Sequence, residues 1–237
     1  MSTNRVLVVN ADDFGASDGV NAGIVTAHEH GIVTSTSMMV RGESVGAAAD
    51  YARTGTLSVG LHVDLGEWSY SDGEWRQLYK VVDLDDRRAV EDELQRQLAL
   101  FQELVGRTPT HLDSHQHVHR DDPLRSALEK TARDLQIPVR NGGGIVYIGA
   151  FYGQADKGTP YPEAITVDAM VALIDGLTDP VSEIACHPAA AADLDTMYAT
   201  ERLTELETLC DPRVREAIDR NGVILCGFGD LGNFLAA

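Results

Sequence analysis

Short apolar runs alternate with longer amphipathic stretches along most of the chain. Residues 6–9 are all apolar, and the run 5–10 that contains them is typical of a buried strand. The clearest helix is predicted over residues 86–105, where apolar side chains recur at intervals of four and three and Gly106 follows as a stop signal. Those side chains are Val90, Leu94, Leu98, Phe101 and Leu104.

The same patterns predict the remaining elements. Six further strands are expected over residues 32–39, 57–65, 110–114, 137–140, 181–186 and 223–228. Helices are expected over residues 18–30, 123–135 and 168–177, with a short Ala-rich helix before residue 57 and one or two helices within 200–220. The stretch after the third strand and residues 141–165 are predicted to be loops.

Strands separated by helices imply parallel βα units in an α/β fold, either an open doubly wound sheet or a closed barrel. A doubly wound nucleotide-binding fold usually carries G-x-G-x-x-G after its first strand, whereas this chain reads A-D-D-F-G at residues 11–15. A dinucleotide phosphate would need exposed backbone N–H groups in this turn, whereas two carboxylates stand there. This difference favours the barrel or a relative of it. A length of 237 residues suits one such domain, 1–237, with a sizeable core.

Composition narrows the classes of partner and compartment. Nineteen Lys and Arg against 37 Asp and Glu give a net charge of -18, which would be repelled by nucleic-acid phosphates and anionic membrane surfaces. The apolar run 6–9 is too short for a signal-peptide core or a membrane span, so the mature protein is expected to begin at Met1. Three cysteines without C-x-x-C spacing suit reduced thiols in a cytoplasm.

Polar side chains gather where predicted strands end. Asp12 and Asp13 follow the first strand, His62 lies in the third, and His187 follows the sixth. The end of the fourth strand carries H-L-D-S-H-Q-H-V-H at residues 111–119. In barrels the strand ends meet on one face, so imidazoles and carboxylates are expected to share a pocket. Two histidines with one carboxylate is a ligand composition used by hydrolytic zinc enzymes and by non-haem iron enzymes.

Each motif also has an ordinary structural interpretation. The Asp pair suits a turn or helix cap, and His62 alone suits a hydrogen-bonded core position. If the fourth strand continued, its period of two would place five polar side chains on one face: His111, Asp113, His115, His117 and His119. Such a face does not suit a buried apolar core and favours a functional site; the structural alternative is a tract exposed to solvent. The aromatic residues after the third strand could stack on sugars, pack within a loop or contact another subunit; they are Trp68, Tyr70 and Trp75.

Seven strings occur together and in order over nearly the whole length of the chain. They are V-N-A-D-D-F-G at 9–15, G-I-V-T-S-T-S at 31–37, G-L-H at 60–62, T-H-L-D-S-H-Q-H-V-H at 110–119, F-Y-G at 151–153, C-H-P-A at 186–189 and R-L-T-E-L-E at 202–207. On these strings the chain resembles the YdjC-type carbohydrate deacetylases, in particular the chitooligosaccharide deacetylases. The resemblance implies a distorted, seven-stranded (β/α) barrel, often a homodimer, that hydrolyses N-acetyl groups of amino-sugar oligosaccharides.

The resemblance also assigns roles to particular residues. Asp13, His62 and His115 match the ligands of a divalent metal ion, with Mg or Zn expected and Mn, Co or Fe acceptable. Asp12 matches the general base and His187 a candidate general acid. Two departures from the family pattern concern loops that shape a cleft. The segment between His62 and the long helix predicted over residues 86–105 is shorter than in the chitooligosaccharide deacetylases, and Gln116 stands where a further histidine can occur.

Two other functions are compatible with the same residues. A metal-dependent hydrolase of another amide or of a phosphoester could use the same ligands. A catalytically silent protein could bind metal and sugar without releasing acetate. An iron-dependent oxygenase shares the ligand composition but usually has an antiparallel double sheet, which the βα alternation disfavours.

Overall fold

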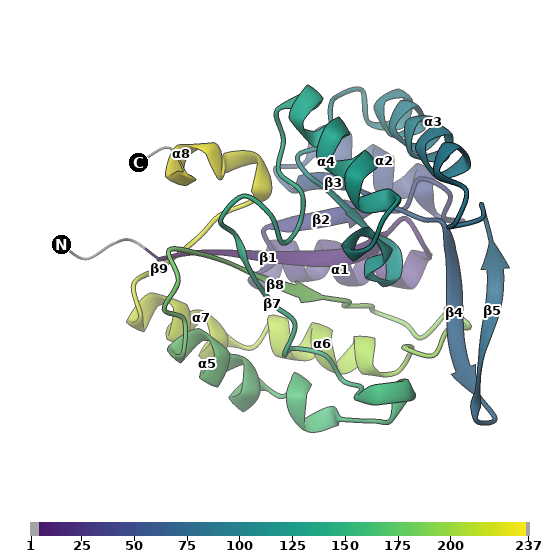
Figure 1. Cartoon of the computed structure of the whole chain (residues 1–237). Helices are drawn as coiled ribbons and strands as arrows, with labels where there is room; N and C mark the ends of the chain where they lie inside the picture. The colour runs from purple at the N-terminus through teal and green to yellow at the C-terminus, as the bar shows by residue number, and fades with distance from the viewer. Residues whose placement is uncertain (1–4, 236–237) are drawn as a thin grey trace.

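A curled sheet of seven parallel strands forms the centre of the molecule, with helices around it (Figure 1). The computed structural model describes residues 5–235. The strand order is β6-β3-β2-β1-β8-β7, and β9 pairs with β1, every pairing being parallel. The strands are β1 (Arg5–Phe14), β2 (Ser35–Met38), β3 (Ser58–Val63), β6 (Leu112–Ser114), β7 (Val146–Ile148), β8 (Val181–Cys186) and β9 (Val223–Leu225). This half-closed sheet confirms the predicted distorted (β/α) barrel of parallel strands.

Helices connect most of these strands. They are α1 (Asp18–His30), α2 (Val45–Thr54), α3 (Arg87–Val105), α4 (Leu124–Leu135), α5 (Val167–Asp175), α6 (Glu201–Leu209), α7 (Pro212–Arg220) and α8 (Gly232–Leu235). Within residues 5–235, four short 3-10 turns complete them: η1 (His115–Arg120), η2 (Asp156–Gly158), η3 (Pro162–Ile165) and η4 (Phe228–Asp230). No helix within residues 5–235 has the length and hydrophobicity that crossing a membrane demands.

Strand β1 lies at the middle of the sheet because its first half, residues 6–9, is apolar on both faces. Residues 6–14 are all buried, and β1 pairs with β2 and β9 along one side and with β8 along the other. Helix α1 begins where the Ser17 hydroxyl accepts a hydrogen bond from the Val20 N–H. Gly23 lets α1 pack directly on the chain after β8, since a Cβ there would lie 2.4 Å from the Ala189 Cα.

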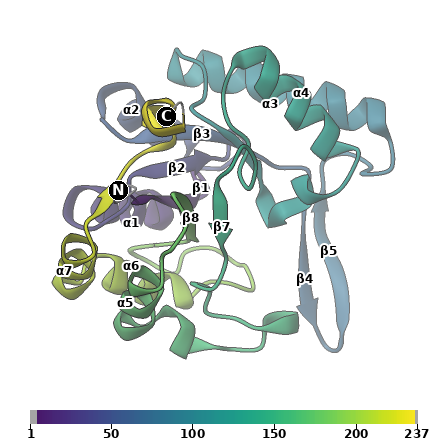
Figure 2. The same ribbon diagram turned by 60° about the vertical axis from the view of Figure 1, so that its left-hand side comes forward.

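The structure corrects three sequence predictions. Residues 137–140 form no strand and make only one isolated bridge, between Leu112 and Val139. Residues 141–165 contain β7, η2 and η3 and are not one irregular loop. The stretch after β3 is a hairpin of β4 (Gly66–Ser71) and β5 (Glu74–Lys80), which pair with each other in antiparallel fashion (Figure 2).

The histidine run does not continue as a strand. Strand β6 ends at Ser114, and Gln116 and His117 adopt left-handed backbone angles, with φ of 49° and 55°. This turn breaks the alternation of faces. The expected single face of four imidazoles and a carboxylate is therefore wrong.

Candidate active site

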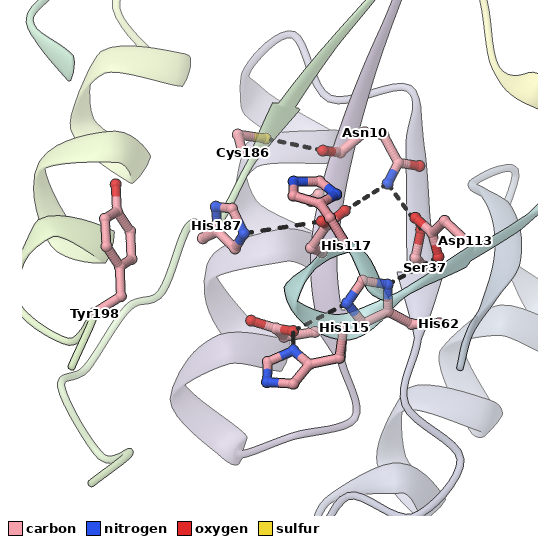
Figure 3. Close-up of polar contacts among 12 residues, drawn as sticks. Asn10, Ser37, His62, Asp113, His115, His117, Cys186, His187 and Tyr198 are labelled. Atoms are coloured by element: carbon pink, nitrogen blue, oxygen red, sulfur yellow. Dashed lines mark hydrogen bonds and ion pairs between the residues drawn. The ribbon is translucent and has the colours of Figure 1, made fainter. Parts of the chain in front are cut away.

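The carboxyl ends of β1, β3, β6 and β8 converge on one cavity of about 710 Å³. Figure 3 shows the polar side chains that these strand ends bring together. Asp12 and Asp13 come from β1, His62 from β3, His115 follows β6, and His187 follows β8. All five residues line the cavity. The sequence prediction that the strand ends share one pocket is confirmed for these positions.

Asp13 lies between two imidazoles. Its Oδ1 atom is 3.4 Å from His62 Nε2 and 3.2 Å from His115 Nδ1. The other oxygen, Oδ2, accepts a hydrogen bond of 2.6 Å from Arg202, which fixes the carboxylate with Oδ1 toward the histidines. Asp13 is also a non-glycine residue with a φ of 70°, an uncommon backbone angle of a kind that is found at turns and that clusters at active sites.

His62 is oriented from behind by Asp113. The Nδ1–H of His62 donates to Asp113 Oδ1 at 2.8 Å, so Nε2 is the nitrogen that faces Asp13. Burial would lower the pKa of His62, but the neighbouring Asp113 and Asp12 carboxylates outweigh it and raise this pKa well above its ordinary value. The surroundings of His62 thus favour a positive charge at this position.

The three side chains have the composition of a divalent-cation site. Asp13, His62 and His115 each offer a ligand atom within 4.8 Å of the other two. Within the described residues, Nε2 of His115 is buried without a hydrogen-bond partner. One carboxylate and two imidazoles, with the second nitrogen of His62 held by a carboxylate, fit Zn²⁺ and other divalent ions that accept mixed nitrogen and oxygen ligands.

Asp12 is held by a buried arginine that the sequence analysis did not identify. Arg140 donates to both Asp12 oxygens, at 2.7 and 2.6 Å, and Asn10 donates to Oδ1 at 2.9 Å. Burial would raise the pKa of Asp12, but Arg140 and His62 outweigh it and lower this pKa below its ordinary value. Asp12 is therefore a carboxylate at neutral pH.

Arg140 also contacts Asp113 at 2.9 Å and Glu183 at 2.6 Å. Its side chain has no exposed surface. The signal in the sequence was an arginine at the end of the apolar stretch 137–140, a position where a buried charge requires partners. The partners lie 27 to 128 residues away, so the sequence could not name them.

His187 lies beside Asp12 in an aromatic surrounding. Its Nε2 atom is 3.8 Å from Asp12 Oδ2, and its ring lies 5.7 and 5.4 Å from the rings of Tyr152 and Tyr198. Burial lowers the pKa of His187 to about 4, so the imidazole is neutral at pH 7. Its backbone N–H donates to Glu205, whose pKa burial raises to about 7.

The other histidines of the run have different surroundings. His111 stacks on Phe228, with ring centroids 3.9 Å apart, and does not line the cavity. Nε2 of His117 is 3.1 Å from the Tyr147 hydroxyl, and Nδ1 of His119 is 2.8 Å from Ser114 Oγ. Neither belongs to the group around Asp13 within the described part of the chain.

Comparison with known proteins gives one consistent family. The family model described as YdjC-like protein matches residues 6–220. A chitooligosaccharide deacetylase of Serratia marcescens is 33% identical over 96% of this chain and 99% of its own length. A carbohydrate deacetylase of Brevibacillus brevis is 32% identical over 95% of this chain and 99% of its own length.

Solved structures share the fold. A protein from Enterococcus faecalis V583, named for cellobiose-phosphate cleavage, has a TM-score of 0.75 at 27% identity, over 96% of this chain and 99% of that one. A peptidoglycan N-acetylglucosamine deacetylase has a TM-score of 0.60 at 12% identity, over 95% of this chain and 87% of that one. At 12% identity, the similarity to this second structure shows a shared fold and nothing more.

Proposed function

The chain belongs to the YdjC-like family, and on that premise we propose that it is a divalent-metal-dependent hydrolase that removes N-acetyl groups from amino-sugar oligosaccharides of the chitooligosaccharide type. The observation that carries the proposal is the grouping of Asp13, His62 and His115 within 4.8 Å, in a cavity that also contains Asp12 and His187. The full-length similarity to named carbohydrate deacetylases supports the substrate class.

Asp13, His62 and His115 are the proposed ligands, with Mg or Zn as the expected metal. An amide carbonyl is a poor electrophile and water a poor nucleophile, and a divalent ion bound there would polarise the first and lower the pKa of the second. The ligand carboxylate is prepared for this role, since Arg202 holds Oδ2 and directs Oδ1 toward both imidazoles.

Asp12 is the proposed general base. It is ionised at neutral pH, and the paired hydrogen bonds from Arg140 fix the plane of its carboxylate next to Asp13. It would accept a proton from the attacking water at Oδ2 or Oδ1.

His187 is the proposed general acid. Being neutral in the free protein, it must first take up a proton before it can pass one to the leaving amine. Its Nε2 lies 3.8 Å from Asp12 Oδ2, so the proton accepted by Asp12 has a short path to the imidazole and then to the sugar nitrogen.

Acetate release tests the proposed activity and the role of Asp12 together. We expect release from N-acetylated mono- and oligosaccharides, loss of release with a chelator, and recovery when a divalent metal is added back. Asp12→Asn should keep the bound metal but lower turnover by about two to four orders of magnitude, the usual contribution of a general base. Asp121→Asn, an exposed carboxylate change, is the matched control.

The results also separate the rival functions. Near-normal turnover by Asp12→Asn would remove Asp12 from its role. Hydrolysis of phosphodiesters in place of acetylated sugars would replace the proposed substrate class. Tight sugar binding without any acetate release would favour a catalytically silent binding protein.

We further propose that the chain is one domain and works as a homodimer in a reducing, cytoplasmic compartment. Cys186, Cys210 and Cys226 are free thiols, and two of them are buried. Sedimentation velocity would give the oligomeric state, and a single denaturation transition would support the single domain. A monomer at all protein concentrations, or two separate transitions, would contradict these proposals.

A further inference from the structure

The β4–β5 hairpin forms one wall of the cavity. It is set apart from the parallel sheet, near its carboxyl end (Figures 1 and 2). Glu67, Trp68 and Trp75 of this hairpin line the same cavity as the Asp13 group. Both indoles keep substantial exposed surface, 41% for Trp68 and 51% for Trp75.

The register of the hairpin collects its aromatic rings on one face. Trp68 pairs with Gln77 and Tyr70 pairs with Trp75. Directly opposite residues share a face, and so do residues two apart, so Trp68, Tyr70 and Trp75 lie together. The Tyr70 and Trp75 rings meet edge to face at 5.4 Å, which steadies the Trp75 indole.

Several contacts hold the hairpin against the cavity. The Gln116 side chain accepts a hydrogen bond from the Trp68 N–H at 2.9 Å and donates one to the Trp68 carbonyl at 2.7 Å. The Tyr79 hydroxyl donates to Asp64 at 3.0 Å. Gln116 directly follows His115, so one turn of chain both presents a proposed metal ligand and fixes the main chain of Trp68.

We propose that Trp68 and Trp75 form a stacking platform for the sugar rings next to the one that is deacetylated, and that Gln116 is the positioning residue for this platform. The inference rests on the proposed function. A pyranose ring has an apolar face of C–H groups that packs on an indole, while its hydroxyl edge stays in water. The platform therefore favours oligosaccharides over single sugars.

A second copy of the chain is the competing occupant, because the hairpin also exposes Leu78 by 50%. Leu78 does not line the cavity, whereas both tryptophans do. Because the surface formed by Trp68 and Trp75 continues into the cavity, it favours a ligand of the cavity over a second copy of the chain as its occupant. The two occupants predict opposite behaviour for Leu78, which makes this residue the matched control.

Tryptophan fluorescence reports on this hairpin alone, because Trp68 and Trp75 are the two tryptophans of the whole sequence. We would titrate the full chain, with chelator present to prevent turnover, with N-acetylglucosamine and with its β-1,4-linked oligomers of increasing length. We expect the emission to shift to shorter wavelength with the oligomers, at concentrations about tenfold or more below any effect of the monosaccharide. Equal responses to monomer and oligomers, or no response, would overturn the platform.

Variants extend the test to turnover. Trp68→Ala and Trp75→Ala should each lower the ratio of kcat/KM for the oligomer to kcat/KM for the monosaccharide by about three- to tenfold, mostly through KM, from the worth of one aromatic contact. Leu78→Ala should leave both values unchanged. If Leu78→Ala and Trp75→Ala instead both weaken a dimer seen by sedimentation and leave the ratio intact, the hairpin is a subunit interface and the proposal fails.

The positioning role of Gln116 is tested by the ratio of kcat/KM for the oligomer to kcat/KM for the monosaccharide, and by the mobility of the indole rings. Gln116→Ala removes both hydrogen bonds to Trp68, so we expect the oligomer preference to fall and the fluorescence anisotropy to drop. Gln116→Glu keeps the acceptor for the Trp68 N–H and should recover part of both. An unchanged ratio in Gln116→Ala would remove its positioning role.

Failure of the hairpin proposal and failure of the proposed function are distinguishable. Acetate release without a length-dependent fluorescence response contradicts only the platform. A length-dependent response without acetate release supports the platform but contradicts deacetylation.

Discussion

Replacing Arg140 by methionine removes the guanidinium that contacts three buried carboxylates. These are Asp12, Asp113 and Glu183, at 2.6, 2.9 and 2.6 Å. Methionine is apolar and of similar length, so the Arg140→Met change chiefly removes the charge. Loss of one partner of a buried ion pair costs about 3–5 kcal/mol, because the charges that remain are buried without compensation. That is a large part of a typical free energy of unfolding of about 5–15 kcal/mol.

The loss of unfolding free energy in Arg140→Met should depend on pH, in a direction that the pKa shifts determine. With Arg140 present, the pKa values of Asp113 and Asp12 are held below their ordinary values despite burial, so these two ion pairs stabilise the fold wherever the carboxylates are ionised. Burial already raises the pKa of the third partner, Glu183, to about 7 despite Arg140. Without Arg140, burial raises the pKa values of these carboxyl groups in the folded state. A raised pKa means that stability falls as pH rises, so the difference between variant and wild type should be largest at pH 7 and shrink toward about pH 5.

Urea denaturation followed by circular dichroism at both pH values measures this difference. Chelator should be present in all samples, because a metal bound only to the folded state adds its own stabilisation. Arg125→Met is the matched control, since Arg125 is 62% exposed and pairs with Glu129 at the surface. The double variant Arg140→Met/Glu183→Gln should recover part of the loss. An Arg140→Met loss no larger than that of the control, or one that does not change with pH, would refute the reasoning.

Three further predictions concern the metal, pH and packing. His62→Ala and His115→Ala should each lower metal content measured by elemental analysis; full occupancy in both would move the ligand assignment to later histidines of the run. Burial raises the pKa of Glu205 to about 7, so ionisation of this group should lower the free energy of unfolding by roughly 3 kcal/mol as pH rises from about 4.5 to about 7. Glu205→Gln should therefore flatten the dependence of unfolding free energy on pH, measured by denaturation at several pH values. An unchanged dependence would contradict the raised pKa of Glu205. Gly23→Ala should lower the melting temperature, because the added Cβ would lie 2.4 Å from the Ala189 Cα. This clash opposes the helix propensity of alanine, which by itself favours the variant by about 1 kcal/mol. A stabilised variant would show that α1 can shift freely.

Local patterns in the sequence were sufficient for most of the helices and for the central strands. The helix over 18–30 and the strand over 181–186 have the predicted bounds, since each follows from apolar spacing and end signals close by. Pattern also placed Asp12, Asp13 and His187 after strands and His62 within one, and the topology of parallel sheets brings the carboxyl ends of strands together.

The sequence also carries a signal for the β4–β5 hairpin. Asp72 and Gly73 form the turn between β4 and β5, with φ of 53° and 85°, and Asp-Gly is a favoured pair for such a turn. Trp68 and Tyr70 alternate with polar residues before it, as in a strand with one exposed face. The turn at Gln116 had no comparable signal, because neither Gln nor His favours left-handed angles as Gly does.

By itself, the sequence determined most of the helices and the central strands, which family the chain belongs to, and which polar residues lie within or just after those strands. Only the tertiary structure decided the partners: that Arg140 compensates Asp12, that Arg202 holds Asp13, and that Asp113 orients His62. Periodicity reflects interactions within a few residues, whereas these contacts join residues 51 to 189 positions apart. Buried charges must find opposite charges, but which ones come within reach depends on how the whole sheet curls.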